Sequence, residues 1–339
     1  MSSTFAARRV GFLDPGVLYA DLRDRLAAKV ELVDLSGAGP ADLVDGVREL
    51  DVVLHHPRVP LTAEVVAAGD RLRAVFAPGA GYDGIPIATA TEVGVLVTNQ
   101  AGCNAEAVAE HSIGLLLAVA KRIPEGDRQI RSPRGWRTAM FLNHEIRGLT
   151  LGLLGFGAIA RRLADIARHG FGMPVLAFDP YVVGAVDGVE LCGLDNLLRR
   201  SDVVSVHVPL TDETRGLLGA PQLALLRPTA ILLNTARGHI VDLDALTVAL
   251  ARGELAGAGL DVFDDDLLAN DDPLLALPNV VVTPHIAGAT FESLESQAVR
   301  QASAVADVLD GRVPTSANVL NPDVVERFLE RFGMKVAGR

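Results

Sequence analysis

The chain has 339 residues, of which 49% are hydrophobic and 22% charged, with a formal net charge of −11 at pH 7. This composition is globular, leaves room for two domains, and excludes a disordered chain. The negative charge argues against a nucleic-acid-binding or anionic-membrane-binding surface.

Short apolar segments alternate with helical patterns along the first hundred residues. The expected strands are residues 10–13, 30–35, 51–54, 72–76 and 95–98, and the expected helices are residues 16–29, 41–48 and 62–68. This alternation predicts a parallel sheet with right-handed crossovers, which binds ligands at the carboxyl ends of its strands. The loops at His56 and at residues 79–81 lie at two such ends.

A long helix is predicted from Asn104 to Lys121. The Asn104 side chain can cap the first turn, and Glu106 suits its positive end. Residues 122–147 contain two prolines and no regular pattern, so we expect an irregular arm there. Such an arm forms an interface or a cover, unless it is a loop without a partner.

The segment from Leu151 to Asp179 reads as strand, glycine turn, helix and strand. Residues 155–160, GFGAIA, fit the G-x-G-x-x-G/A pattern of dinucleotide-binding turns. Gly155 permits the tight turn, and Gly157 lets backbone N–H groups approach a pyrophosphate at the helix N-terminus. A methyltransferase can carry a similar turn, and the sequence of the turn leaves that alternative open.

Asp179 ends the second strand of this segment, residues 174–178. A carboxylate at this place accepts hydrogen bonds from a ribose 2′-hydroxyl and repels a 2′-phosphate, so we expect NAD rather than NADP.

The strand pattern resumes after the glycine turn, and polar residues follow several strands. The expected strands are residues 202–208, 230–234, 257–261 and 280–283. Arg237, the acidic run Asp261–Asp266 and His285 follow three of them. A helix from Thr290 to Leu309 then returns the chain to the first domain.

These three strand ends carry the groups that hydride transfer to a 2-oxo acid requires. Arg237 can grip a carboxylate with two parallel hydrogen bonds and polarise the adjacent carbonyl. His285 can transfer a proton near neutral pH, and a neighbouring carboxylate would orient its ring. Each also has a plainer interpretation, as a surface arginine, a loop histidine or a solvated acidic run. His207, His111 and Cys103 are interpreted as structural.

The motifs together resemble the D-isomer-specific 2-hydroxyacid dehydrogenases, which include glyoxylate/hydroxypyruvate reductases and phosphoglycerate dehydrogenases. The resemblance covers nearly the whole chain. It rests on residues 79–83 (GAGYD), 104–110 (NAEAVAE), 151–160, 201–209 (SDVVSVHVP), 234–238 (NTARG), 259–263 (GLDVF) and 283–288 (TPHIAG).

The resemblance implies roles for particular positions. It implies that the catalytic residues are Arg237, Asp266 and His285, and that the substrate-binding residues are Ala80, Gly81, Asn104 and Arg237. It implies that the cofactor-binding residues are Gly155, Gly157, Ala158, Ile159, Asp179, Val208, Pro209, Thr235, Ala236, Arg237, Asp261, His285 and Gly288. Asp261 would hold the nicotinamide amide. No metal is expected.

Two departures from the family pattern bear on the chemistry. Asp266 stands where the family usually has Glu, one methylene longer, so Asp265 could serve His285 instead. His56-Pro57 stands where members acting on phosphorylated or hydroxylated substrates often carry Arg-Ser, which puts 3-phosphoglycerate in doubt.

The fold expected is α/β, with two doubly wound parallel-sheet domains. Residues 1–102 plus 290–339 would form a discontinuous, flavodoxin-like substrate domain, and residues 103–289 an NAD-binding Rossmann domain. The function expected is NAD-dependent interconversion of a small 2-oxo acid and its D-2-hydroxy acid. A NAD(H)-sensing protein of the same fold, largely without turnover, is the alternative. The resemblance implies a homodimer, and the expected partner is the small 2-oxo or 2-hydroxy acid, with no nucleic acid and no membrane. The two cysteines show no metal-type spacing, and a cytoplasmic location is the simplest account.

Overall fold

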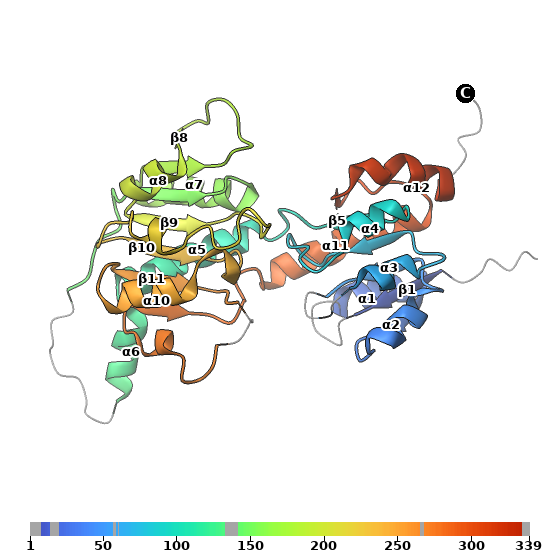
Figure 1. Ribbon diagram of the computed structural model, residues 1–339, viewed down its shortest axis with the longest axis horizontal. Helices are drawn as coiled ribbons and strands as arrows, with labels where there is room; N and C mark the ends of the chain where they lie inside the picture. Colours follow the sequence, from blue (N-terminus) through green and yellow to red (C-terminus); the bar gives the residue numbers. More distant parts are fainter. Residues whose placement is uncertain are drawn as a thin grey trace, which may run out of the picture. The chain divides into compact units, whose positions relative to one another are not determined.

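The computed structural model describes residues 8–13, 20–56, 59, 61–132, 142–264 and 268–333 (Figure 1). The chain divides into two compact units. Unit 1 is drawn from residues 1–104 and 291–339, and unit 2 is formed by residues 105–290. Each unit is an α/β structure around one sheet, which confirms the predicted fold class.

The sheet of unit 1 has the strand order β13-β5-β4-β3-β1-β2. Its strands are β1 (Arg9–Phe12), β2 (Glu31–Asp34), β3 (Val52–Leu54), β4 (Ala74–Phe76), β5 (Leu96–Asn99) and β13 (Asn318–Val319). The strands β1 to β5 are parallel in the flavodoxin-like order 2-1-3-4-5, and β13 pairs with β5 in the antiparallel direction. The sequence did not predict β13, because two residues carry no strand pattern.

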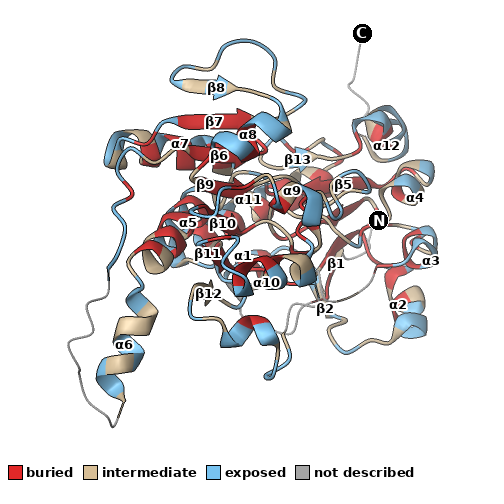
Figure 2. Ribbon diagram, turned by 60° about the vertical axis from the view of Figure 1, so that its left-hand side comes forward, coloured by how far each residue is buried: buried red, intermediate tan, exposed pale blue. Residues whose placement is uncertain are grey.

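Helices cover both faces of this sheet, as two separate apolar cores show. The helices are α1 (Ala20–Ala27), α2 (Pro40–Val47), α3 (Ala63–Ala67), α4 (Ile87–Glu92), α11 (Phe291–Leu309) and α12 (Val325–Phe332). One core joins α1, α11 and α12 to the sheet, and the other joins α2, α3 and α4 to the opposite face. Figure 2 shows the central strands as buried.

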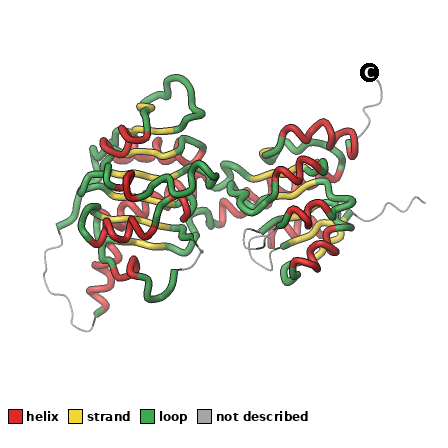
Figure 3. Tube along the Cα trace, viewed as in Figure 1, coloured by secondary structure: helices red, strands yellow, loops and turns green. Residues whose placement is uncertain are grey.

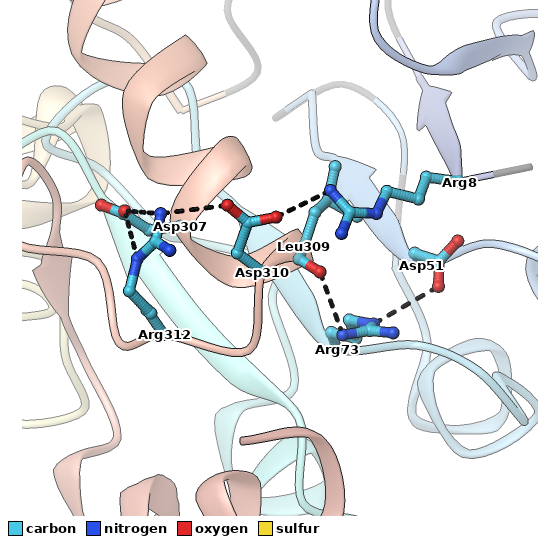
Figure 4. Close-up of polar contacts among 7 residues, drawn as sticks. All are labelled: Arg8, Asp51, Arg73, Asp307, Leu309, Asp310 and Arg312. Atoms are coloured by element: carbon cyan, nitrogen blue, oxygen red, sulfur yellow. Dashed lines mark hydrogen bonds and ion pairs between the residues drawn. The ribbon is translucent and has the colours of Figure 1, made fainter. Parts of the chain in front are cut away.

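Charged side chains join the C-terminal end of α11 to the rest of unit 1 (Figure 4). Arg73 donates to the carbonyl of Leu309 at 3.3 Å and to the buried carboxylate of Asp51. Arg8 donates to Asp310 at 2.8 Å. A cation at the last carbonyls of a helix complements its negative end, so these contacts favour the docked position of α11.

Asn321, which follows β13, joins the C-terminal segment to β5. Its Oδ1 accepts from the N–H of Val97 at 2.8 Å, and its Nδ2 donates to the carbonyl of Val95 at 3.0 Å. The side chain is 5% exposed, so it satisfies backbone groups that water does not reach.

The sheet of unit 2 has the strand order β12-β11-β10-β9-β6-β7-β8, and every pair is parallel. Its strands are β6 (Leu151–Leu154), β7 (Val175–Phe178), β8 (Val189–Leu191), β9 (Val203–Val206), β10 (Ile231–Asn234), β11 (Gly257–Leu260) and β12 (Val280–Val282). Counted from β6, this is the Rossmann order 3-2-1-4-5-6 with one further strand. The order reverses between β6 and β9, where this fold binds its ligands.

Two layers of helix enclose the sheet of unit 2. The helices are α5 (Ala105–Ala120), α6 (Ile123–Arg131), α7 (Ala158–Phe171), α8 (Leu194–Arg200), α9 (Ala220–Leu223) and α10 (Leu243–Ala251). The first core contains α5 and α7, and the second contains α8, α9 and α10. No helix among the described residues is both long and apolar enough to cross a bilayer.

The prediction of an irregular arm over residues 122–147 is wrong for its first part, which is the helix α6 (Figure 3). Pro124 lies in the first turn, where proline is tolerated, and Glu125 and Arg131 lie at the ends that favour their charges. Residues 133–141 of the predicted arm lie outside the described residues.

The predicted cap by Asn104 is also wrong. Residues 101–104 form a turn in which the N–H of Cys103 donates to the carbonyl of Gln100 at 3.1 Å. A cap residue needs extended backbone. Within the described chain, the buried Oδ1 of Asn104 accepts no hydrogen bond.

Candidate functional site

The glycine turn between β6 and α7 contains two glycines with different surroundings. Gly155 is packed against backbone, and Gly157 has open space beside it. Gly155 has φ +90°, and a Cβ there would lie 2.9 Å from the backbone of His207 and Val208 after β9. A Cβ at Gly157 would meet no atom within 4 Å. Gly155 therefore allows two strand ends to meet at the switch point, whereas the space at Gly157 fits the close approach of a pyrophosphate.

Asp179, at the end of β7, holds the same turn. Its Oδ2 accepts from the N–H of Phe156 at 2.8 Å, and its Oδ1 accepts from the N–H of Tyr181 at 2.9 Å. Carboxylate oxygens have further lone pairs, so the half-buried side chain can still accept from a ribose hydroxyl. Ala158 and Ile159 begin α7, and Ala160 is buried against the sheet.

His207 lies at the end of β9, before Val208 and Pro209. Its Nε2 is 2.8 Å from Oγ of Ser205, and loss of solvent lowers the pKa of the ring to about 4. The imidazole is therefore neutral at physiological pH, in agreement with its predicted structural role.

The turn after β10 carries Thr235, Ala236 and Arg237. Asn234 is buried, accepts from the N–H of Ala236 at 3.0 Å and donates to the carbonyl of Arg237 at 2.8 Å. The half-buried Arg237 donates from Nη1 to the carbonyl of Ala236 at 2.6 Å. At Gly238 a Cβ would lie 2.1 Å from the carbonyl carbon of Phe263, so this turn packs directly on the loop after β11.

The turn after β12 carries His285 with the left-handed φ of +55°. The residue is exposed, and its backbone N–H donates to the carbonyl of Asp261 at 2.8 Å. Non-glycine residues rarely adopt this conformation, and those that do cluster at functional sites.

The Asp261 carboxylate points into the turn that carries His285. It is fully buried and accepts from Oγ1 of Thr283 at 2.5 Å and from the N–H groups of Ile286 and Ala287. The predicted contact of this residue is with the nicotinamide amide, whereas these contacts of its carboxylate are with the turn after β12.

The parallel register brings Arg237, Asp261 and His285 to one edge of the unit 2 sheet, after the adjacent strands β10, β11 and β12. Neighbouring strands lie about 4.8 Å apart, so the outer two strand ends are separated by about 10 Å. The side chains of an arginine and a histidine are long enough to reach a small carboxylic acid bound between strand ends at that separation. Gly288 follows in the same loop.

Asp265 and Asp266 lie outside the described residues. The preceding Asp264 is described, and its Oδ1 lies 3.7 Å from Nδ1 of His239. Among the described residues, no cluster of three or more His, Cys, Asp or Glu side chains could hold a metal ion.

The predicted substrate residues Ala80, Gly81 and Asn104 belong to unit 1. Nδ2 of Asn99 donates to the carbonyl of Ala80 at 2.6 Å, which anchors the loop to the end of β5. His55, after β3, is buried, and this burial lowers the pKa of its ring to about 4.

Sequence reasoning missed Thr283 and Asn234, which shape the two turns that carry His285 and Arg237. Both are polar residues adjoining apolar strand segments, and this pattern is a weak signal for a buried hydrogen-bonding role.

Comparisons with known proteins show which proteins this chain is similar to. Residues 113–287 match the model of the D-isomer specific 2-hydroxyacid dehydrogenase NAD binding domain. The chain is 40% identical over 290 residues to a glyoxylate reductase of Korarchaeum cryptofilum, covering 84% of this chain and 86% of the relative.

Two of the similar solved structures each cover about nine tenths of the chain. The D-lactate dehydrogenase of Aquifex aeolicus, complexed with NAD and lactic acid, is 30% identical with a TM-score of 0.79, covering 90% of this chain and 96% of that one. The NADPH-dependent glyoxylate/hydroxypyruvate reductase of Sinorhizobium meliloti, in complex with NADP and malonate, is 29% identical with a TM-score of 0.81, covering 89% and 93%.

Proposed function

The chain belongs to the D-isomer-specific 2-hydroxyacid dehydrogenase family, and from this premise we propose that it interconverts a small 2-oxo acid and its D-2-hydroxy acid with NAD(H). The observation that carries the proposal is the shared edge of the unit 2 sheet. Arg237 and His285 follow strands separated only by β11, and the glycine turn follows β6 of the same parallel sheet.

Arg237 holds the substrate carboxylate with its planar guanidinium and polarises the neighbouring C2 carbonyl. His285 gives a proton to the developing alkoxide in reduction and takes it back in oxidation. Bound nicotinamide supplies or accepts the hydride at C2. Asp266, or Asp265 in its place, orients the His285 ring; this role rests on the sequence, since both lie outside the described residues.

The cofactor is held mainly by the β6–α7 turn and by the ends of the neighbouring strands. The proposed contacts are Gly155, Gly157, Ala158, Ile159, Asp179, Val208, Pro209, Thr235, Ala236, Arg237, Asp261, His285 and Gly288. The open space at Gly157 supports a dinucleotide, and the half-buried carboxylate of Asp179 supports NAD rather than NADP. Relatives of both kinds exist: one has NAD bound, and another is NADPH-dependent.

The substrate is a small 2-oxo acid, with glyoxylate as the first candidate. The proposed contacts in unit 1 are Ala80, Gly81 and Asn104. His56 lacks the guanidinium fork of the family's Arg at this place, which argues against 3-phosphoglycerate.

The active form is a homodimer in the cytoplasm. The helix α6 buries none of its residues, and Ile123 and Ile130 are 56% and 68% exposed. These two residues are seven apart and share one face of the helix, as an apolar contact with a second copy requires. Both cysteines are free, which suits a reducing compartment.

A scan of 2-oxo acids with NADH tests the proposed function. We expect NADH oxidation with glyoxylate, hydroxypyruvate or pyruvate, and much weaker oxidation of NADPH. Asp179→Ala should reduce the preference for NADH over NADPH, because the variant lacks the carboxylate that repels a 2′-phosphate. Tight NADH binding with no turnover of any 2-oxo acid would identify the chain as a NAD(H)-sensing protein instead.

A further inference from the structure

We propose that Asp261 and Thr283 are positioning residues, linked to His111 of α5, that fix the turn carrying His285. The inference rests on the proposed role of His285 as the proton donor. It explains why the buried carboxylate of Asp261 lies against the turn after β12.

Asp261 gathers the N–H groups of three consecutive residues. Its carbonyl accepts from His285 at 2.8 Å, its Oδ1 from Ile286 at 2.9 Å and its Oδ2 from Ala287 at 2.8 Å. Two of these N–H groups, those of Ile286 and Ala287, converge on the carboxylate, as consecutive N–H groups can do beside a left-handed residue. That left-handed residue is His285, which directly precedes them and has a φ of +55°. The carboxylate therefore sets the backbone from which the imidazole projects.

Thr283 extends the contact to α5. Its hydroxyl donates to Oδ1 of Asp261 at 2.5 Å, and Nε2 of His111 lies 3.0 Å from the same hydroxyl oxygen. A hydroxyl has one proton, and Thr283 gives it to the carboxylate. The hydroxyl oxygen must therefore accept from His111, which requires the proton on Nε2.

The same helix also reaches the neighbouring turn. Oγ of Ser112 donates to the carbonyl of Val108 at 2.8 Å and lies 3.2 Å from Oγ1 of Thr235, two residues before Arg237. Successive residues of α5 therefore support the turns after β10 and β12. The same helix therefore supports the backbone of both Arg237 and His285.

Thr283→Val tests the proposal, because valine keeps the shape of threonine and removes the hydroxyl. We expect kcat for the best 2-oxo acid to fall about tenfold to a hundredfold, the range for small misplacement of a catalytic group. The KM of the substrate and the Kd of NADH should change less than about threefold, since neither ligand contact is removed. Thr283→Ser, which restores the hydroxyl, should recover most of the lost kcat.

Thr247→Val is the matched control. Thr247 is half-buried in α10 and donates to the carbonyl of Leu243 at 2.8 Å, so this variant also loses one hydroxyl contact within unit 2. Its kcat should remain near that of the wild type. If Thr283→Val and Thr247→Val lower stability alike and leave kcat unchanged, the proposal is overturned.

A second measurement does not depend on turnover. Nuclear magnetic resonance of the protein with ¹⁵N-labelled histidine, assigned with His111→Gln and His285→Gln, should show His111 with its proton on Nε2. Thr283→Val should move the His285 ring signals, and Thr247→Val should not. A neutral His111 with its proton on Nδ1 would contradict the chain of hydrogen bonds. If the wild type turns over no 2-oxo acid, the proposed function fails while this test still decides the positioning network.

Discussion

His285 carries its imidazole on a backbone that residues with a side chain rarely adopt. Three contacts to Asp261 hold the residues from His285 to Ala287 in that turn, while the His285 side chain itself stays exposed. Proton transfer to a bound substrate requires an imidazole that the substrate can reach and a backbone that holds it in one position. The turn at His285 provides both.

Removing the ring tests this residue directly. In His285→Ala we expect turnover to fall by about 10²- to 10⁴-fold, the usual contribution of a general acid, because the alkoxide loses its proton donor. NADH binding should change far less than turnover, since the glycine turn and the other proposed cofactor contacts are untouched. The two quantities are measured by steady-state kinetics and by NADH fluorescence titration. Unchanged turnover on a good substrate would remove His285 from the mechanism.

The two glycines of the turn between β6 and α7 have different physical roles. Gly155 combines φ +90° with a backbone neighbour 2.9 Å from the place of a Cβ. Gly157 has φ −80°, at the N-cap of α7, and open space beside it. One glycine serves the packing of two loops, and the other leaves room for a ligand.

Alanine at each position should separate these tasks. Gly155→Ala should lower the free energy of unfolding by about 1–3 kcal/mol or more, because both the conformation and the contact become strained. Gly157→Ala should change that free energy by less than about 1 kcal/mol, yet weaken NADH binding about tenfold or more, which corresponds to about 1.4 kcal/mol.

Thermal unfolding and NADH titration of both glycine variants provide the check. If Gly157→Ala binds NADH as tightly as the wild type, the space beside Gly157 is not where the pyrophosphate lies.

Across the whole chain, unit 1 is completed by residues that the sequence places last. The C-terminal segment covers the edge of β5, and the buried Phe328 of α12 joins the same core as α11. The Asn321 side chain makes the polar contacts between this segment and β5.

Asn321→Ala should lower the free energy of unfolding by about 1–3 kcal/mol, because the N–H of Val97 would remain buried without an acceptor. Denaturant titration measures the loss. The control is Asn318→Ala, in the same segment, where the side chain is exposed and makes a longer contact of 3.3 Å to Asn99. Equal effects of the two substitutions would contradict the role given to Asn321.

The sequence was most informative where local chemistry decides the structure. The glycine turn, the parallel strands and the polar strand ends follow from apolar periodicity and from residue types at fixed spacing. The helix α6 was missed because two prolines suggested a break, although Pro124 lies in the first turn. The chain from His111 through Thr283 to Asp261 joins residues up to 172 positions apart, so only the folded arrangement of the strands brings them together.

The division of the first unit between both ends of the polypeptide has a consequence for its synthesis. Residues 105–290 are contiguous and leave the ribosome before α11 does, so the second unit can close while translation continues. The strands β1 to β5 must wait for residues 291–339, with part of one sheet face still unburied. The nascent N-terminal stretch is therefore the region that a chaperone would meet first.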